Sequence, residues 1–263
     1  MCEFSHSGLP NSPAAIIASH ISGIDSTIGV HGTGFFVRSG ANVYFVTARH
    51  CLGVNRDAAI EKVNELLIPY KIKNGKVLNK DLLNFPAISF GFSQNDPDSF
   101  VDSGDLDIAI LSIDSSETKI YKHLLSRAFK LPPTGDWLTR SIPRLRSADD
   151  KAHADIFRVI GYPLHGTATE IRYDRNLIVT QGVVLEGRVV GNGPYPHTKS
   201  LRISPDNQVI NDANGLSGSP VVLRLNNTLS GPQYFLAGMV INGTYPNLHF
   251  IDISCVTNLI NNI

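Results

Sequence analysis

The chain has 263 residues, of which 42% are hydrophobic and 17% are charged, a composition typical of a globular protein rather than a disordered one. Lys plus Arg and Asp plus Glu both total 23, so no net charge favours nucleic acid or a membrane surface as a partner. The three cysteines are far apart and predict no disulfide framework, the N-terminus shows no secretory leader, and no run is long enough to span a bilayer. We therefore expect a cytoplasmic protein, with export by a signal-less route left open.

Short apolar runs separated by Gly, Pro, Asn and Asp predict many β-strands and few helices. In chain order, strands are expected at 28–37, 43–47, 66–72, 87–92, 107–113, 155–160, 177–190, 200–203, 220–225, 234–241 and 248–253. Helices are expected at 117–129 and 254–260, and 57–67 is either a third helix or part of an inserted loop. This pattern favours an all-β sandwich or barrel.

A change in composition between residues 130 and 151, where prolines break any regular element, predicts a boundary between two β-halves. We therefore divide the chain into an N-terminal extension at 1–27, a first half at 28–130, a linker at 131–152 and a second half at 153–263.

Two short segments of the first half carry titratable side chains at the ends of apolar runs. His50 follows the run 43–47, where it is well placed to face a cleft. Asp107 opens the run 108–111, and a carboxylate at the edge of a buried strand must be hydrogen-bonded or paired. Asp105 is a rival for the same role. Taken singly, each residue also fits a purely structural role.

In the second half, the segment 215–220 reads Gly-Leu-Ser-Gly-Ser-Pro. A serine nucleophile needs a base, a group that orients the base, and donors for the oxyanion of the transition state. Gly215 lets the chain turn its N–H toward the same point as that of Ser217, and Gly218 permits close approach behind the nucleophile. A Gly-Ser turn before a strand is the structural alternative. The order His, Asp, Ser on a β-background indicates nucleophilic acyl transfer.

These segments resemble the motifs of chymotrypsin-like serine peptidases: Thr47-Ala48-Arg49-His50-Cys51, Asp107-Ile108-Ala109-Ile110-Leu111 and Gly215-Leu216-Ser217-Gly218-Ser219-Pro220. Ile160-Gly161-Tyr162-Pro163 and Gly182-Val183-Val184 are similar to the start of the second barrel in the bacterial HtrA-like branch. The resemblance covers about residues 28–256. No PDZ-like module is expected, because only about seven residues follow.

The resemblance implies two antiparallel six-stranded β-barrels, with the active site in the cleft between them and a short C-terminal helix. It implies that His50 is general base and then acid, that Asp107 fixes the tautomer of His50, and that Ser217 is the nucleophile. The N–H groups of Gly215 and Ser217 would form the oxyanion hole. From the reference pKa of histidine, we expect activity to fall below about pH 6 to 7.

Departures from the family pattern shape further expectations. Leu216 stands where the trypsin branch has an Asp that pairs with a new N-terminus, so we expect no such activation switch. The long interval after Cys51 suggests an insertion, roughly 53–105, that shapes access to the cleft. The position that forms the pocket floor in the family is Asn211, so a strong preference for Lys or Arg is not supported, although Asp212 keeps it open. Ile241 to Gly243 would bind an extended substrate through backbone hydrogen bonds, and His249 is a weaker candidate for the pocket.

The expected function is thus serine endopeptidase activity on protein or peptide substrates, with no cofactor and no metal. The alternative is a catalytically silent module of the same fold that binds peptide segments. An α/β-hydrolase is excluded by the reversed order of the three residues and by the strand that follows Ser217. The sequence leaves the natural substrate, the oligomeric state and regulation open.

Overall fold

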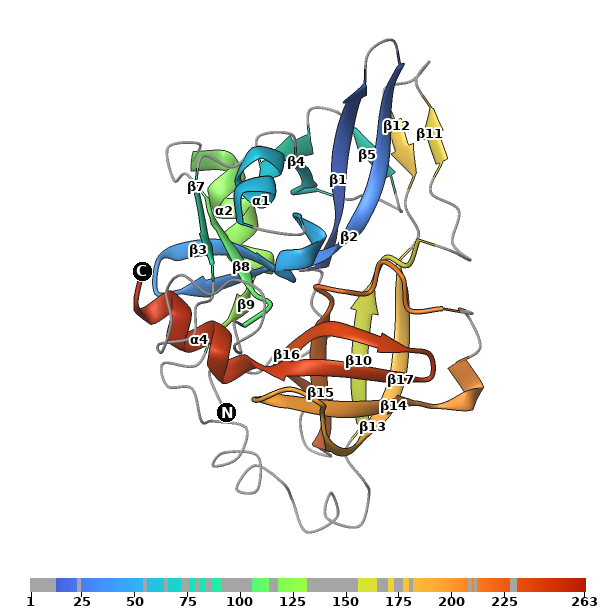
Figure 1. Cartoon of the computed structure of the whole chain (residues 1–263). Coiled ribbons are helices and arrows are strands. Elements are labelled where there is room, and N and C mark those ends of the chain that lie inside the picture. Colours follow the sequence, from blue (N-terminus) through green and yellow to red (C-terminus); the bar gives the residue numbers. More distant parts are fainter. Residues whose placement is uncertain are drawn as a thin grey trace.

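The structure of the chain, a computed structural model, describes residues 13–22, 25–53, 56–63, 66–71, 76–78, 81–83, 87–90, 106–113, 118–131, 156–164, 170–172, 177–179, 182–207, 210, 212–227 and 231–263. Most of the expected linker at 131–152 lies outside these residues. The described part is mostly β, as the short apolar runs predict, and its strands form two halves that lie one above the other in Figure 1.

The first half is an eight-stranded sheet of order β6-β4-β1-β2-β3-β8-β7, in which β9 pairs with β2 in parallel. Within the described residues, the end strands β6 and β7 do not pair with each other, so the first barrel stays a prediction. The segment assigned to an N-terminal extension contributes β1, which pairs with β2 along its whole length. The strands are β1 (Pro13–Ser22), β2 (Asp25–Ser39), β3 (Asn42–Thr47), β4 (Leu66–Pro69), β6 (Leu82–Leu83), β7 (Ala87–Phe90), β8 (Ala109–Ser112) and β9 (Phe129–Lys130).

The second half is a closed six-stranded barrel of order β10-β13-β14-β17-β16-β15, as expected. The pairings between these strands are antiparallel. Its strands are β10 (Ile156–Gly161), β13 (Val183–Asn192), β14 (Thr198–Ile203), β15 (Pro220–Asn227), β16 (Gly231–Thr244) and β17 (Asn247–Asp252).

A small third sheet connects the two halves. It has the order β11-β12-β5 and consists of β5 (Lys76–Leu78), β11 (Glu170–Arg172) and β12 (Leu177–Val179). The run expected as one strand at 177–190 is therefore two strands, β12 and β13. Because β5 belongs to the expected insertion at 53–105, part of that insertion is tied to the second half of the chain.

The described helices are α1 (Arg56–Val63), α2 (Thr118–Arg127) and α4 (Ile253–Asn261). The helices expected at 117–129 and 254–260 are α2 and α4, and the open choice at 57–67 is decided in favour of a helix. The Asp252 carboxylate caps α4 by accepting a hydrogen bond from the Ser254 amide at 2.8 Å. None of the helices in the described ranges is long and apolar enough to cross a membrane.

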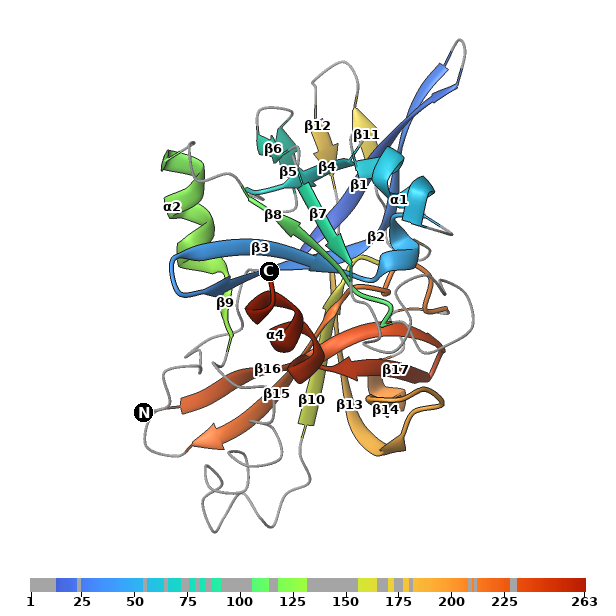
Figure 2. The ribbon, with the colours of Figure 1, turned by 60° about the vertical axis from the view of Figure 1, so that its left-hand side comes forward.

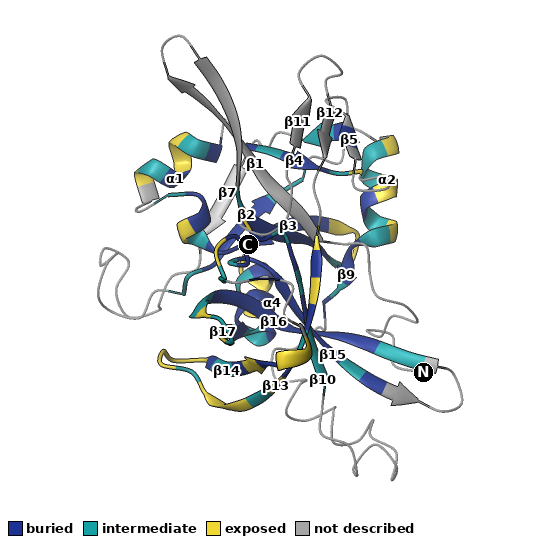
Figure 3. Ribbon diagram, turned by 90° about the vertical axis from the view of Figure 1, so that its right-hand side faces the viewer, coloured by how far each residue is buried: buried dark blue, intermediate teal, exposed yellow. Residues whose placement is uncertain are grey.

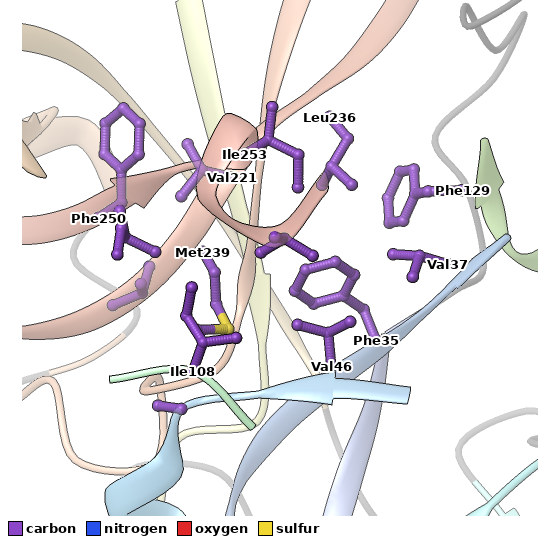
Figure 4. Close-up of a cluster of buried hydrophobic side chains, with 14 of the residues drawn as sticks. Phe35, Val37, Val46, Ile108, Phe129, Val221, Leu236, Met239, Phe250 and Ile253 are labelled. Atoms are coloured by element: carbon purple, nitrogen blue, oxygen red, sulfur yellow. The ribbon is translucent and has the colours of Figure 1, made fainter. Parts of the chain in front are cut away.

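One continuous hydrophobic core spans both halves. In Figure 4, Phe35 and Val46 of the first-half sheet face Met239 and Leu236 of the barrel strand β16. Their side chains are 0 to 2% exposed. Figure 2 shows α4 lying between β3 above and β16 below, and Figure 3 shows buried segments of β3 above buried segments of β16. This shared core gives the residues at the junction a rigid base.

Candidate active site

Strand register explains why His50 and Asp107 meet. Strand β3 pairs with β8 so that Thr47 lies opposite Ala109, and two further residues along the same antiparallel register place Asp107 opposite Arg49. The Arg49 amide donates to the Asp107 carbonyl at 3.3 Å. A 3-10 turn at Arg49–Cys51 then directs His50 toward the Asp107 side chain. Asp105, the rival candidate, lies outside the described residues.

The Asp107 carboxylate holds His50 at two points. Its Oδ2 accepts from Nδ1 of the ring at 2.6 Å, and its Oδ1 accepts from the His50 amide at 3.0 Å. With Nδ1 as the donor, the neutral ring keeps Nε2 as a proton acceptor. The carboxylate thus sets the orientation and the tautomer that a general base needs.

The same contact changes the titration of His50. Burial by itself would lower the pKa of the ring, but the hydrogen bond to Asp107, the charge of that carboxylate and a contribution from Cys51 raise the pKa of His50 to about 10. The His50 side chain is 46% exposed, so solvent screens its pairing with Asp107. The direction is nevertheless upward, which moves the expected acid limb of activity above the pH 6 to 7 given by the reference pKa.

Two consecutive tight turns hold Ser217. The Leu216 amide donates to the Ala213 carbonyl at 3.0 Å, and the Ser219 amide donates to the Leu216 carbonyl at 2.9 Å. The third residue of each turn is a glycine with positive φ, Gly215 at 86° and Gly218 at 83°, as type II turns require. A Cβ on Gly218 would lie 1.9 Å from the Thr33 carbonyl oxygen. The glycine spacing in the sequence is therefore the spacing of two turns that place Ser217 at a tip.

Thr33, on β2 of the first half, fastens these turns across the junction. Its amide donates to the Ser217 carbonyl at 3.1 Å, and its Oγ1 donates to the Gly215 carbonyl at 2.8 Å. The same Oγ1 accepts from the Tyr162 amide at 2.9 Å. Because Thr33 is 0% exposed, these are buried hydrogen bonds, and the position of the Ser217 turn depends on the first half as well as on the barrel.

His50 and Ser217 face one cavity of about 350 Å³ between the two halves. The Ser217 hydroxyl donates to the Ile241 carbonyl at 3.2 Å, so its single proton points to β16 rather than to His50. The structure therefore brings the three candidate residues to one place, with His50 and Asp107 in direct contact and Ser217 facing the same space.

The amides of Gly215 and Ser217 donate to no protein acceptor among the described residues, and both residues line the cavity. The Asn214 carbonyl accepts from the Leu164 amide at 2.8 Å. Since a trans peptide points its C=O and N–H in opposite directions, that bond also fixes the direction of the Gly215 N–H. Two oriented amide donors at a cavity wall are suited to binding an oxyanion.

The structure describes the expected substrate-binding residues only in part. Gly243 lines the cavity, as does its neighbour Asn242, whereas the Ile241 side chain is buried at 5% exposure. Strand β16 pairs with β15 only as far as Met239, opposite Pro220. At residues 241–243, therefore, no described strand pairs with the edge of β16 that β15 covers earlier in the strand. Asn211, the expected pocket floor, lies outside the described residues.

Two weaker candidates for the pocket have other contacts. The Asp212 carboxylate accepts from the Asn214 amide at 3.0 Å, within its own turn. The Nδ1 of His249 is 3.1 Å from Ser200 Oγ on β14, and neither Asp212 nor His249 is among the residues that line the cavity. The structure thus gives no support to His249 as a pocket residue, because its side chain contacts the neighbouring strand β14.

Sequence reasoning gave no role to Thr33, His31 or Lys62, although His31 and Lys62 line the cavity, and it included Asn242 only within the expected wall at 241–243. For Thr33, a buried hydroxyl between two glycines was the available signal. Among the described residues, no group of three or more His, Cys, Asp or Glu side chains is arranged to hold a metal ion.

The chain belongs to the trypsin-like peptidase domain family, whose model matches residues 32–230. The match covers more than half of the chain and includes all three candidate residues. A comparison with individual curated proteins found no match.

Proposed function

We propose that this chain is a serine endopeptidase that hydrolyses peptide bonds through an acyl-enzyme intermediate, with Ser217, His50 and Asp107 as its catalytic residues. The observation that carries the proposal is that His50, oriented by Asp107 at 2.6 Å, faces the same cavity as Ser217. Membership of a peptidase family makes this chemistry the expected one.

In the first step, the Ser217 hydroxyl leaves the Ile241 carbonyl and attacks the substrate carbonyl carbon while its proton moves to Nε2 of His50. The amides of Gly215 and Ser217 bind the oxyanion that forms. His50 then gives the proton to the leaving amine, and the C–N bond breaks to leave an ester on Ser217. Water, deprotonated by the same ring, hydrolyses the ester and restores the hydroxyl. Throughout, Asp107 stabilises the imidazolium and stays ionised.

Leu216 supports a site that needs no activation cleavage. Its side chain is 0% exposed, and a Cβ on Gly161 would lie 2.9 Å from Leu216 Cδ2. This apolar anchor takes the place of an ion pair beneath the Ser217 turn. We propose that the site is formed without a new N-terminus.

An extended substrate would pair with the open edge of β16 at Asn242 and Gly243.

We also propose the two-barrel architecture for the whole chain and a place in the HtrA-like branch, supported by the segment 160–163 at the end of β10. A reducing compartment such as the cytoplasm would suit the buried free thiols of Cys51 and Cys255.

One observation favours the alternative of a silent peptide-binding module: the Ser217 hydroxyl is bonded to Ile241 and not to His50. The two functions are separated by incubating a denatured protein mixture with the wild-type chain or with Ser217→Ala and sequencing the new termini by mass spectrometry. New termini that appear only with the wild-type chain support the peptidase. Equal patterns from both proteins, with peptide binding retained, support the silent module.

A further inference from the structure

The first-half wall of the cavity is basic. Three of the residues that line the cavity carry ionisable nitrogen side chains, His31, His50 and Lys62, and none of the lining residues is Asp or Glu. The nearest carboxylate that the site uses, Asp107, is bonded to His50. A ligand entering this space therefore meets positive charge and hydrogen-bond donors on that side.

His31 and Lys62 form a pair on this wall. Lys62 Nζ, near the end of α1, is 3.1 Å from His31 Nδ1 on β2. An ammonium has only donors, so Nδ1 accepts and the ring carries its proton on Nε2. No carboxylate of the described residues forms an ion pair with Lys62. The Lys62 ammonium has donors beyond the one directed at His31 and carries a positive charge, and a carboxylate is the acceptor that complements it best.

The pair lies on the same side of the cavity as the base. His50 must protonate the departing amine, which places the leaving-group part of the substrate next to the first-half wall. The opposite wall carries Gly243 and the open edge of β16, which suits the acyl part. The backbone next to His31 packs closely against both sides of the site: a Cβ added to the following residue, Gly32, would lie 2.7 Å from Cys51 Sγ and 3.5 Å from the Ser217 carbonyl oxygen.

We propose that the His31–Lys62 pair makes this site selective for substrates with an acidic side chain on the leaving-group side of the cleaved bond. This inference rests on the proposed peptidase function and names the substrate class of the same site. It also gives part of the insertion at 53–105 a role, because α1 supplies Lys62 to the cavity.

The test uses peptides with both ends blocked that differ only by Glu or Gln at the first or second position after the cleaved bond. We expect kcat/KM to favour Glu over Gln by about tenfold, the size of one charge-assisted hydrogen bond. Lys62→Met should bring the Glu:Gln ratio toward one, and Lys62→Glu should invert it. The matched control is Lys122→Met, at an exposed lysine of α2 outside the cavity, which should keep the wild-type ratio.

Two further measurements keep this proposal separate from the peptidase assignment. Binding of the same peptides to Ser217→Ala, followed by fluorescence anisotropy, needs no catalysis and should show the same preference for Glu. In the wild-type chain, raising the salt concentration should reduce that preference, which requires no variant at Lys62. Cleavage without a Glu preference would overturn the selectivity alone. Glu-selective binding without cleavage would overturn the peptidase alone, and equal binding of both peptides would overturn the selectivity in any case.

Discussion

Replacement of Thr33 by valine tests whether the first half positions the nucleophile turn. Valine keeps the shape of threonine but removes the hydroxyl, which donates to the Gly215 carbonyl at 2.8 Å and accepts from the Tyr162 amide at 2.9 Å. Gly215 and Thr33 are buried, so the substitution leaves two backbone groups without their partner. Each such group costs about 1–3 kcal/mol, and we expect a loss of about 2–6 kcal/mol in the free energy of unfolding.

Thr33→Val should also lower activity beyond its effect on stability. Release of the Gly215 carbonyl loosens the Gly215–Leu216 peptide, which lies in the chain between the two proposed oxyanion donors, the amides of Gly215 and Ser217. Misplacement of one such donor costs about 3 kcal/mol, or a factor of about 100 to 1,000 in kcat. The assay is kcat and KM on a fluorogenic peptide at a temperature where chemical denaturation shows that the variant is folded. KM should change far less than kcat.

Thr257→Val is the matched control. Thr257 is 1% exposed, and its hydroxyl donates to the Ile253 carbonyl inside α4, outside the cavity. It should lose some stability and keep its kcat. If Thr33→Val retained the wild-type kcat and unfolding free energy, the role assigned to the Thr33 hydroxyl would be wrong.

Three further predictions concern the same machinery. Only neutral His50 accepts a proton, and Asp107 raises its pKa, so kcat/KM of the wild-type chain should rise with pH with a midpoint above 6.5. Asp107→Asn should lower the midpoint of this profile and reduce the rate by a factor of about 10⁴. A midpoint that is the same in the variant and the wild type would contradict the role given to Asp107. Ser219 Oγ is buried and has no hydrogen-bond partner among the described residues, so Ser219→Ala should leave the free energy of unfolding unchanged or raise it by about 1 kcal/mol. A clear decrease in the free energy of unfolding would show that this hydroxyl does have a partner. Gly218→Ala should lower the free energy of unfolding by several kcal/mol and abolish activity, because φ at this position is 83° and the new Cβ would clash with the Thr33 carbonyl. A variant with the melting temperature of the wild type would show that the structure places this turn wrongly.

Candidate site residues that stand in a recognisable local pattern could be picked out from the sequence alone. His50 and Ser217 follow from strand ends and glycine turns, and the choice of Asp107 agrees with a pairing register that places it beside the His50 turn. The short strands and turn residues predict a sandwich or a barrel, and the family resemblance implies the closed six-stranded barrel that the second half forms. These features are encoded within a few neighbouring residues, so they can be predicted from single segments.

Features that depend on distant pairing could not be predicted in this way. Nothing local in 13–22 shows that it pairs with β2, and the pairing of β5 with β12 joins residues about a hundred positions apart. The roles of Thr33 and Lys62 likewise arise only when the halves meet. The raised pKa of His50 is a consequence of geometry, so the reference pKa of histidine, which is all that the sequence offers, predicts a lower acid limb than the structure does.

Covalent labelling with a fluorophosphonate probe, which reacts with an activated serine and not with an ordinary hydroxyl, tests the assigned nucleophile without any choice of substrate. We expect one labelled residue, Ser217, mapped by mass spectrometry, with labelling abolished in Ser217→Ala and strongly slowed in His50→Ala. A folded wild-type chain that stays unlabelled, or that is labelled at another serine, would contradict the proposed triad.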